Sequence, residues 1–285
     1  MSKVAVAPEA CAAANDSLLA SERREWHRAR LLEQPLTWLA PDEVEMHFRL
    51  MPDRYWERVT AADLKWGLET VHGFLKLVAA PHQPATAPYI EWRADLEPNR
   101  TRVMLCTWDR HGLLAKASAA FSAVRLNIVQ AEVHTRADHI VLDTFQVEEP
   151  DGRREIPAER LQEMSFLLEG ALSEPPRFAS VWACSRHKFL QGPTRLRPQV
   201  TFDNESLARS TLIRVVAQDR LGLLFDLLQA LADEGVAIAQ ADIETKSGLA
   251  QDVLEATEAG GAKIADARRQ VELAARITAA LTVPE

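Results

Sequence analysis

The chain of 285 residues is 47% hydrophobic and 26% charged, and 6% of its residues are aromatic. At about 100–200 residues per domain, this length predicts two or three small domains with ordinary globular cores. The composition excludes fibrous, collagen-like and fully disordered proteins. Because no run of about 18 apolar residues occurs in the sequence, we expect no membrane-spanning helix.

The net charge of −8 is unevenly distributed along the chain. It is −4 over residues 1–99, +2 over residues 100–198 and −6 over residues 199–285. None of these parts contains a basic block from which a phosphate-binding surface could be built. We therefore expect no nucleic-acid partner.

The cysteines and the first residues favour a cytoplasmic protein. Cys11, Cys106 and Cys184 are few, odd in number and without a paired spacing, which fits a reducing compartment better than a disulfide framework. The N-terminus lacks the charged head, apolar stretch and cleavage site of a secretory signal. We interpret residues 1–15, which are rich in small residues, as a disordered tail.

The segment 16–85 has the pattern of several helices. We expect one helix over 16–34 and another that begins near Pro41, a residue favoured in a first helical turn. The clearest helix covers 61–79, with Thr60 as its N-cap and apolar residues at spacings of three or four. This stripe consists of Leu64, Leu68, Val71, Leu75 and Val78.

Prolines between residues 81 and 88 mark the end of the helical segment. Residues 89–94, which follow them, have the pattern of a strand. The helical segment is also rich in tryptophan, and packing in a core or between domains explains these side chains without a cofactor. They are Trp26, Trp38, Trp56 and Trp66.

An internal repeat is the most informative feature of the sequence. Thr107–Leu114 matches Ala217–Leu224 at an offset of 110 residues, and both contain an Asp-Arg-x-Gly-Leu-Leu turn. Further matched pairs are Gln130 with Gln240, Ala131 with Ala241, Thr135 with Thr245 and, after a gap of one residue, Asp143 with Asp252. The chain beyond residue 100 therefore contains two related units.

Each repeat predicts the order strand, helix, strand, strand, helix. These elements cover 102–108, the helix after Gly112, 127–136, 140–148 and 157–171 in the first unit, and 211–217, the helix after Gly222, 236–246, 249–257 and 266–281 in the second. With one further strand, this is the βαββαβ order of a ferredoxin-like fold. We predict an α+β protein with domains at 86–198 and 199–285, preceded by the helical segment.

The two glycine turns are candidate ligand sites. A glycine between a strand and a helix lets a ligand approach the backbone, and the free N–H groups of the first helical turn favour a carboxylate or a phosphate. Asp109 and Asp219 have two interpretations: they cap these helices, or they accept a hydrogen bond from a ligand amine. A purely structural explanation also accounts for both turns, in which the glycine permits a tight turn, the aspartate caps the helix and the leucines pack in the core. Asn127 offers a donor and an acceptor to a zwitterionic ligand or is a turn residue, whereas the equivalent Ala237 offers neither.

Catalytic motifs are absent from the sequence. It has no His-Glu-x-x-His, Gly-Lys-Ser/Thr, Gly-x-Ser-x-Gly or paired-cysteine zinc pattern. His134 and His139 flank a predicted hairpin turn, where solvated histidines are a better explanation than a metal site. Asp242 and Glu244 share the polar, solvated side of a strand, and Cys106 is a small hydrophobe. We expect no catalytic site, metal or cofactor.

Four segments carry a family resemblance: His47–Trp56; Leu126–Ile128 followed by Ala131 and His134-Thr135; Leu142–Phe145; and Phe202–Ser206 leading into Asp219–Leu224. The repeats resemble ACT domains, small βαββαβ ligand-binding modules that regulate amino-acid and nitrogen metabolism. Residues 43 to about 281 resemble the C-terminal region of bifunctional PII uridylyltransferase/uridylyl-removing enzymes.

The resemblance implies glutamine sensing. In that family, tandem ACT domains report nitrogen status to nucleotidyltransferase and HD phosphohydrolase domains, whose motifs this sequence lacks. We expect no uridylyl transfer by this chain, because nothing in it would hold the metal ions that neutralise phosphates.

The resemblance also implies the ligand-binding residues. They are Asp109, His111, Gly112, Leu113, Leu114, Asn127 and Ile128 in the first unit, and Asp219, Leu221, Gly222, Leu223, Leu224 and Ile238 in the second. The family's proline before the glycine is replaced by His111 and Leu221. We expect a ligand carboxylate on the Gly112 helix amides and its ammonium group near Asn127, with the second site eroded by Ala237.

Two hypotheses follow. The first is a non-catalytic regulator whose ACT domains bind an amino acid, with glutamine favoured, and pair with each other or across a homodimer. The alternative is an interaction module that senses no ligand, in which the tryptophan-rich helical segment docks on a separate uridylyltransferase or a PII-like partner. The eroded second site favours the alternative.

Overall fold

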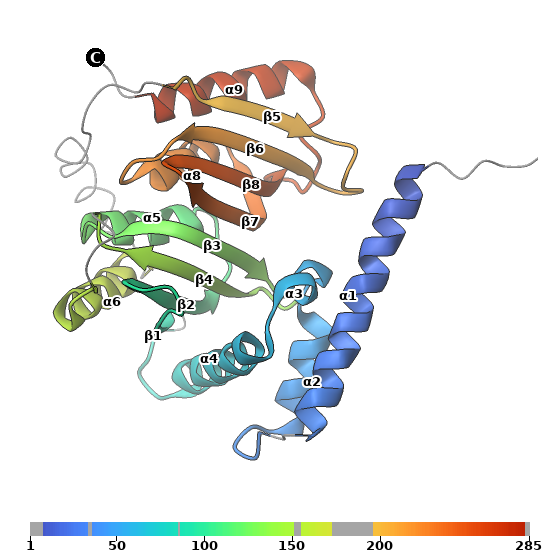
Figure 1. Cartoon of the computed structure of the whole chain (residues 1–285), viewed down its shortest axis with the longest axis vertical. Helices are drawn as coiled ribbons and strands as arrows, with labels where there is room; N and C mark the ends of the chain where they lie inside the picture. Colours follow the sequence, from blue (N-terminus) through green and yellow to red (C-terminus); the bar gives the residue numbers. More distant parts are fainter. Residues whose placement is uncertain (1–7, 34–35, 85, 151–154, 173–195, 283–285) are drawn as a thin grey trace, which may run out of the picture.

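The computed structural model describes residues 8–33, 36–84, 86–150, 155–172 and 196–282. Within these residues, one antiparallel sheet occupies the centre of the molecule and helices cover both of its faces (Figure 1). Residues 1–7 of the predicted tail, the linker at 173–195 and Cys184 lie outside the described residues. None of the described helices is both long enough and apolar enough to cross a membrane.

The strands are β1 (Tyr89–Ala94), β2 (Arg100–Trp108), β3 (Asn127–Thr135), β4 (Ile140–Glu148), β5 (Gln199–Asp203), β6 (Thr211–Gln218), β7 (Val236–Lys246) and β8 (Leu249–Glu258). The helices are α1 (Pro8–Glu33), α2 (Pro41–Leu50), α3 (Asp53–Arg58), α4 (Ala61–Ala79), α5 (Leu113–Ala123), α6 (Ala158–Leu172), α8 (Leu223–Asp233) and α9 (Ala267–Leu281). We call β1 to α6 the first unit and β5 to α9 the second unit.

Each unit has the four-stranded antiparallel sheet of a ferredoxin-like fold, which confirms the predicted α+β class. The strand order across the whole sheet is β1-β2-β4-β3-β7-β8-β6-β5. The position of the fourth strand differs from the expected βαββαβ order, because β1 and β5 precede the first repeat strand in each unit. An edge position requires only antiparallel pairing with β2 or β6, so a strand from either end of the unit can occupy it. The strand expected at 89–94 is confirmed, whereas β5 was not predicted.

The two units join edge to edge through β3 and β7. These strands pair antiparallel, from Gln130 opposite Glu244 to His134 opposite Gln240. The equivalent helices α5 and α8 contact each other above this junction, which we call the seam. Because β3 and β7 are equivalent strands of the repeat, the seam relates the units by an approximate two-fold axis.

The first half of the sheet is buried on both faces. Along β2, Val103 and Leu105 face the core beneath α5 and α6, whereas Met104 and Cys106 face the helical segment. Since successive side chains of a strand point to opposite faces, one strand contributes to both cores. The run of apolar residues in β2 follows from this double burial, and Cys106 is a buried hydrophobe as expected.

The helical segment packs on the face opposite α5 (Figure 1). Thr60 caps α4 by accepting from the Asp63 N–H at 3.1 Å. Trp56 is fully buried and stacks on Phe48 with ring centroids 4.7 Å apart. The packing explanation is therefore correct for Trp56 and for the buried Trp66. It is wrong for Trp26 and Trp38, which are 55% and 44% exposed.

One element boundary differs from expectation. Helix α1 begins at Pro8, so residues 8–15 are helical although the sequence indicated a tail through residue 15. The helix predicted to begin near Pro41 is confirmed as α2, which ends at Leu50 because Met51 and Pro52 are extended, and α3 follows from Asp53. The predicted domain boundaries at 86–198 and 199–285 stay a prediction.

Helix α3 bridges the seam on the face opposite α5 and α8. Asp242 on β7 forms ion pairs with Arg54 and with Arg58, whose Nη1 lies 2.6 Å from the carboxylate. The interpretation of Asp242 as a solvated residue is therefore wrong, since its side chain is 18% exposed. Glu132 lies directly opposite Asp242 on β3, so the arginines also offset the repulsion of two like charges across the seam.

The histidine interpretation is correct for one residue and wrong for the other. His139 is exposed in the hairpin turn, whereas His134 is buried beneath α3, where its ring packs edge-on against Tyr55 at 5.3 Å. Burial lowers the pKa of His134 to about 3, so this ring is neutral and belongs to the packing of the helical segment.

Arg54→Met should weaken the attachment of the helical segment. The variant keeps an apolar stem but leaves Asp242 with one arginine while Glu132 still faces it, so we expect the free energy of unfolding to fall by about 1–2 kcal/mol. Urea denaturation measures this change. Arg49→Met, which removes an exposed arginine of α2, is the matched control and should stay within about 0.5 kcal/mol of wild type. Equal effects of the two substitutions would contradict the bridging role.

Candidate functional site: two cavities at the seam

The two glycine turns have the same backbone geometry. The Asp109 N–H donates to the His139 carbonyl at 2.8 Å, and the Asp219 N–H donates to the Gly248 carbonyl at 2.9 Å. Gly112 and Gly222 have φ angles of +71° and +79° and immediately precede α5 and α8. Only glycine adopts this left-handed conformation without steric cost, which explains the residue at both positions.

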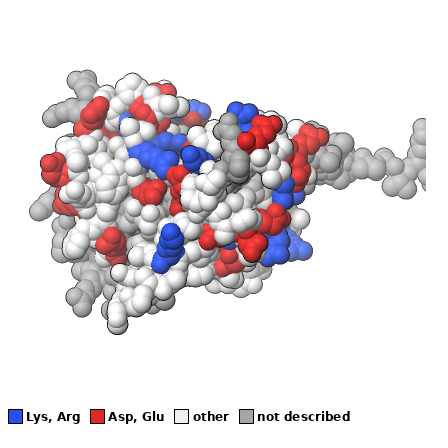
Figure 2. Space-filling model, turned by 90° about the horizontal axis from the view of Figure 1, so that it is seen from below, with Lys and Arg blue, Asp and Glu red and all other residues white. Residues whose placement is uncertain are grey.

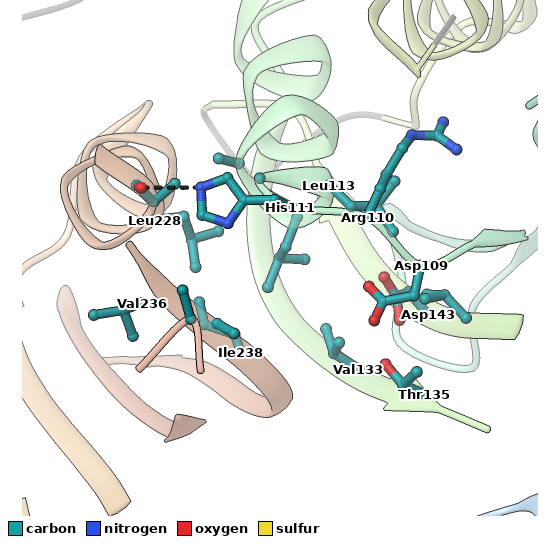
Figure 3. A pocket seen from close by; sticks show the side chains of 17 residues that line it. Asp109, Arg110, His111, Leu113, Val133, Thr135, Asp143, Leu228, Val236 and Ile238 are labelled. Carbon is teal, nitrogen blue, oxygen red and sulfur yellow. Dashed lines mark hydrogen bonds between the residues drawn. The ribbon is translucent and has the colours of Figure 1, made fainter. Parts of the chain in front are cut away.

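An open cavity of about 350 Å³ lies beside the Gly112 turn. Residues of the first unit line one side of it, and α8 with the beginning of β7 lines the other (Figure 3). The residues that matter below are Asp109, His111, Val133, Thr135 and Asp143 of the first unit, and Leu228, Ala232, Val236, Ala237 and Ile238 of the second. The cavity therefore depends on both units.

The side chains of His111 and Arg110 form hydrogen bonds outside the interior of the cavity. The His111 ring crosses the seam, where Nε2 lies 3.0 Å from the Ala232 carbonyl and donates to it as the protonated nitrogen (Figure 3). The Arg110 guanidinium points away from the carboxyl group of Asp109 and donates to the carbonyls of Trp108 and Leu172. The interior is thus lined by apolar side chains, the hydroxyl group of Thr135 and two aspartates, Asp109 and Asp143.

A much smaller cavity of about 20 Å³ lies beside the Gly222 turn, and we call it the closed cavity because of its small volume. Here Asn127 and Ile128 of the first unit face Asp219, Leu223 and Leu224 of the second. The Asn127 amide donates to the Asp219 carboxylate at 3.4 Å. Burial raises the pKa of Asp219, and hydrogen bonds from Asn127, Thr245 and the Arg220 N–H oppose this shift. A volume of this size holds about one water molecule.

The expected combination of Gly112 and Asn127 within one unit is wrong. Asn127 pairs with Glu148 at one end of the first unit's sheet, whereas Trp108, just before the Gly112 turn, pairs with Ile140 at the other end. Eight residues of extended strand, about 26 Å, separate the two ends. Gly112 instead shares the open cavity with Ala237 and Ile238, and Gly222 shares the closed cavity with Asn127 and Ile128.

Most of the other expected site residues reach one of the cavities. Leu113 and Leu114 line the open cavity, and Leu223 and Leu224 line the closed one. Leu221 lines neither of them. The glycine turns are thus at the positions that the repeat indicates. Each turn, however, shares its cavity with the beginning of β3 or β7 from the other unit.

Sequence reasoning did not identify the two buried carboxyl groups, Asp143 and Asp252. Asp143 is fully buried at the open cavity, and Asp252, 2% exposed, lies at the closed one. Each has one oxygen without a hydrogen-bond partner among the described residues. Burial raises the pKa of Asp143 well above its usual value and that of Asp252 to about 8, each with help from the nearby turn aspartate. The signal in the sequence was an aspartate at matched positions of the repeat.

Within the described part of the chain, neither the charge on the face of Figure 2 nor clusters of metal-ligating side chains indicate a further site. On the face seen in Figure 2, basic and acidic side chains are intermingled, so this face has no extended surface of one charge. No group of three or more His, Cys, Asp or Glu side chains among the described residues is arranged to hold a metal ion.

Comparison with known families supports the fold. Residues 199–284 match the model of the "ACR9-like, ACT-like domain". The second unit is an ACT-like domain. The first unit has the same strand order and the same glycine turn, and pairs with this ACT-like domain along β3.

The curated relatives are bifunctional uridylyltransferase/uridylyl-removing enzymes. The chain is 27% identical over 245 residues to the enzyme of Azospirillum brasilense, covering 85% of this chain and 26% of the relative. It is 28% identical to that of Gluconobacter oxydans, covering 93% and 28%, and 33% identical to that of Nitrobacter winogradskyi, covering 61% and 19%. The resemblance found in the sequence is therefore confirmed, and the chain spans about a quarter of the length of the first two relatives.

Among solved structures, aspartate kinase from Synechocystis aligns with 67% of this chain and 29% of its own, at 16% identity and a TM-score of 0.34. The assignment of the fold therefore rests on the strand order and on the match of the ACT-like domain.

Asp252→Asn should stabilise the protein increasingly as the pH rises. The folded-state pKa of about 8 exceeds the usual 3.8, so the folded state holds a proton that the unfolded chain releases. This contribution to stability is complete below about pH 4 and is lost as the pH rises toward 8, whereas asparagine does not ionise. We expect thermal midpoints that differ little at pH 4.5 and are several degrees higher for the variant at pH 8, at about 2–4 °C for each kcal/mol.

The control for this measurement is Asp233→Asn, at an exposed position of α8, which should show no pH-dependent gain. A midpoint of Asp252→Asn that follows wild type from pH 4.5 to 8 would contradict the raised pKa.

Proposed function

We propose that the chain is a non-catalytic regulatory module that binds an amino acid in the open cavity. One observation supports this most directly: a cavity of about 350 Å³ lies between the two units and includes the glycine turn of the first. Small-molecule sites have about this volume or more and favour the interface between domains. The closed cavity, at about 20 Å³, has no room for an amino acid.

The Gly112 turn suits a carboxylate. At the start of α5 the Leu113 N–H donates to the Arg110 carbonyl, whereas the N–H groups of Leu114 and Ala115 have no acceptor within the helix. The helix dipole also favours negative charge at this end. Gly112 has no side chain to cover them, and a Cβ there would point toward Ala232, across the seam. The ligand carboxylate would therefore contact both the turn and α8.

The remainder of the cavity suits a short side chain with a polar end. Leu228, Val236 and Ile238 are apolar, and Thr135 supplies a hydroxyl group to the lining. We favour glutamine because the relatives are uridylyltransferase/uridylyl-removing enzymes and the family resemblance implies glutamine sensing. The two units then correspond to ACT domains at 86–198 and 199–285 that pair within one chain in the cytoplasm, and further pairing across a homodimer is compatible with the free edges β1 and β5.

Amino-acid binding to the open cavity can be tested by isothermal titration with the common amino acids. We expect one site for each chain and a loss of at least about tenfold in affinity, ~1.4 kcal/mol, in Gly112→Asp, which adds negative charge where the ligand carboxylate would lie. Gly248→Asp is the control, because Gly248 has a φ of +77° and no neighbour within 4 Å of an added Cβ. Asn127→Ala should bind as wild type does, since Asn127 lies at the closed cavity.

Failure of wild type to bind any amino acid, or unchanged affinity in Gly112→Asp, would refute this proposal.

We propose docking of a partner protein on α1 as a second candidate function, because several large apolar side chains are exposed there. Leu19, Trp26 and Leu32 of α1 and Trp38 of the following turn are 48%, 55%, 77% and 44% exposed. Leu19 and Trp26 are two helical turns apart and so share one face of α1. A hollow of about 340 Å³ is lined by Trp38 together with Arg30 and Lys65, among others, and suits an acidic or aromatic side chain of a partner. Exposed apolar groups of this kind mark interaction surfaces.

A pull-down with purified uridylyltransferase and PII-like proteins tests this second candidate. Wild type should capture one of them, and the double substitution Trp26→Ala with Leu32→Ser should abolish capture. Phe166→Ser, which removes a side chain of α6 that is 74% exposed, is the control and should retain it. Capture that survives the double substitution would exclude α1 as the docking surface.

A further inference from the structure

Asp143 is a buried carboxyl group whose hydrogen bonds are incomplete. One oxygen accepts from the His134 N–H at 3.3 Å, and the other has no partner among the described residues. The side chain is fully buried and lines the open cavity. A buried polar oxygen without a partner is costly, which indicates that a donor belongs in the cavity.

Asp109 supplies a second carboxyl group at the same place. Its side chain comes from the turn before α5 and lies next to that of Asp143, with the oxygens of both residues together at one end of the cavity (Figure 3). The apolar side chains of Val133 and Val141 also line the cavity. Two carboxyl groups in apolar surroundings attract a cation with several N–H donors.

We infer that Asp109 and Asp143 form a subsite for the ammonium group of an amine-bearing ligand, and that binding of this group releases a proton from Asp143. This inference rests on the proposed function and deepens it, because it names the part of the ligand that the two carboxyl groups recognise. It also makes the affinity of the site dependent on pH.

The closed cavity supports the inference independently. It has the same pair of carboxyl groups, Asp219 and Asp252, and the Asn127 amide donates to Asp219 from across the seam. At the open cavity the position equivalent to Asn127 is Ala237, which has no donor and leaves space. The protein's own amide thus supplies an N–H at one cavity, and the ligand's ammonium group would supply it at the other.

No cation of the protein competes for the two carboxyl groups among the residues that line the cavity. Arg110 donates to carbonyls away from it, and His111 is bonded to Ala232. From β3, the side chains of Glu132 and His134 point to the opposite face, toward α3, as does Cys106 of β2. The lining residues of α5, α8 and β7 are uncharged: Leu113, Leu114, Ala115, Leu228, Ala232, Val236, Ala237 and Ile238.

The proton balance follows from these surroundings. Burial and the nearby charge of Asp109 raise the pKa of Asp143 well above its usual value, so the empty cavity holds Asp143 as a neutral acid. When the ammonium group binds, the O–H bond of Asp143 breaks, its proton passes to the buffer, and the carboxylate accepts an N–H of the ligand. The ligand keeps its three ammonium hydrogens, and no covalent bond forms.

Isothermal titration of wild type with glutamine at pH 6, 7 and 8, in phosphate and in Tris, tests the inference. The difference in apparent enthalpy between the two buffers gives the number of protons released, and we expect up to one for each ligand. The Kd should fall by up to about tenfold for each pH unit while Asp143 is protonated in the free protein. Asp143→Asn should bind more weakly, release no proton and show a Kd independent of pH.

Two controls separate this effect from a general loss of structure. Asp252→Asn, the equivalent substitution at the closed cavity, should release as many protons as wild type. Glutaramate, which is glutamine without its α-amino group, should bind wild type at least about tenfold more weakly than glutamine, and this comparison needs no variant.

Each outcome decides the inference. Binding of glutamine without proton release, or equal binding of glutaramate, overturns the ammonium subsite and leaves the proposed function intact. Failure of wild type to bind any amino acid overturns both. Proton release that is lost in Asp143→Asn and retained in Asp252→Asn supports the inference.

Discussion

The antiparallel pairing of β3 with β7 is the interaction on which the rest of the structure depends. It converts two four-stranded sheets into one sheet and brings α5 and α8 into contact. Both cavities lie at this seam, and α3 crosses it on the other face through Arg54, Arg58 and Tyr55. A unit on its own would expose the edge of β3 or β7 and would have only one side of each cavity.

Strand directions explain why each turn meets the other unit. β2 and β3 run parallel, since both pair antiparallel with β4, so the helix between them returns the chain to the opposite end of the sheet. Asn127 therefore begins β3 far from Gly112, and the antiparallel seam carries it to the Gly222 turn. The predicted βαβ order already implied this separation. The expectation of a site within one unit failed because residues close in sequence were treated as close in space.

The sequence predicted the two cores well because their signals are local. The apolar stripe of α4 indicated which face of that helix is buried, and the repeat located both turns. The edge strand β5 and the exposure of Trp26 and Trp38 were not predictable in the same way, because they depend on which segments pack together. The same limit applies to Asp242, whose arginine partners lie 184 and 188 residues earlier in the chain.

The difference between Asn127 and Ala237 leads to the opposite conclusion about the two sites when the structure, and not the order of residues in the sequence, is considered. Within one unit, Ala237 indicates an eroded second site; across the seam, it leaves the first turn open, while Asn127 fills the second. The replacement of asparagine by Ala237 therefore no longer supports the alternative hypothesis of an interaction module that senses no ligand. What remains for docking is the exposed face of α1, an independent observation.

Buried carboxyl groups without full hydrogen bonding distinguish the seam from the rest of the core. Asp242 is satisfied by two arginines, and its burial therefore stabilises the contact with α3. Asp143 and Asp252 each have one oxygen without a hydrogen-bond partner in the described part of the chain, so their burial destabilises the seam. A ligand that supplies the missing donor to Asp143 stabilises the folded protein by mass action. The open cavity is also lined by residues of β3 and β7, the two strands that α3 contacts on the other face. Occupancy of the open cavity would then act directly on the junction that holds the helical segment to the sheet, with no need for a pathway through either core.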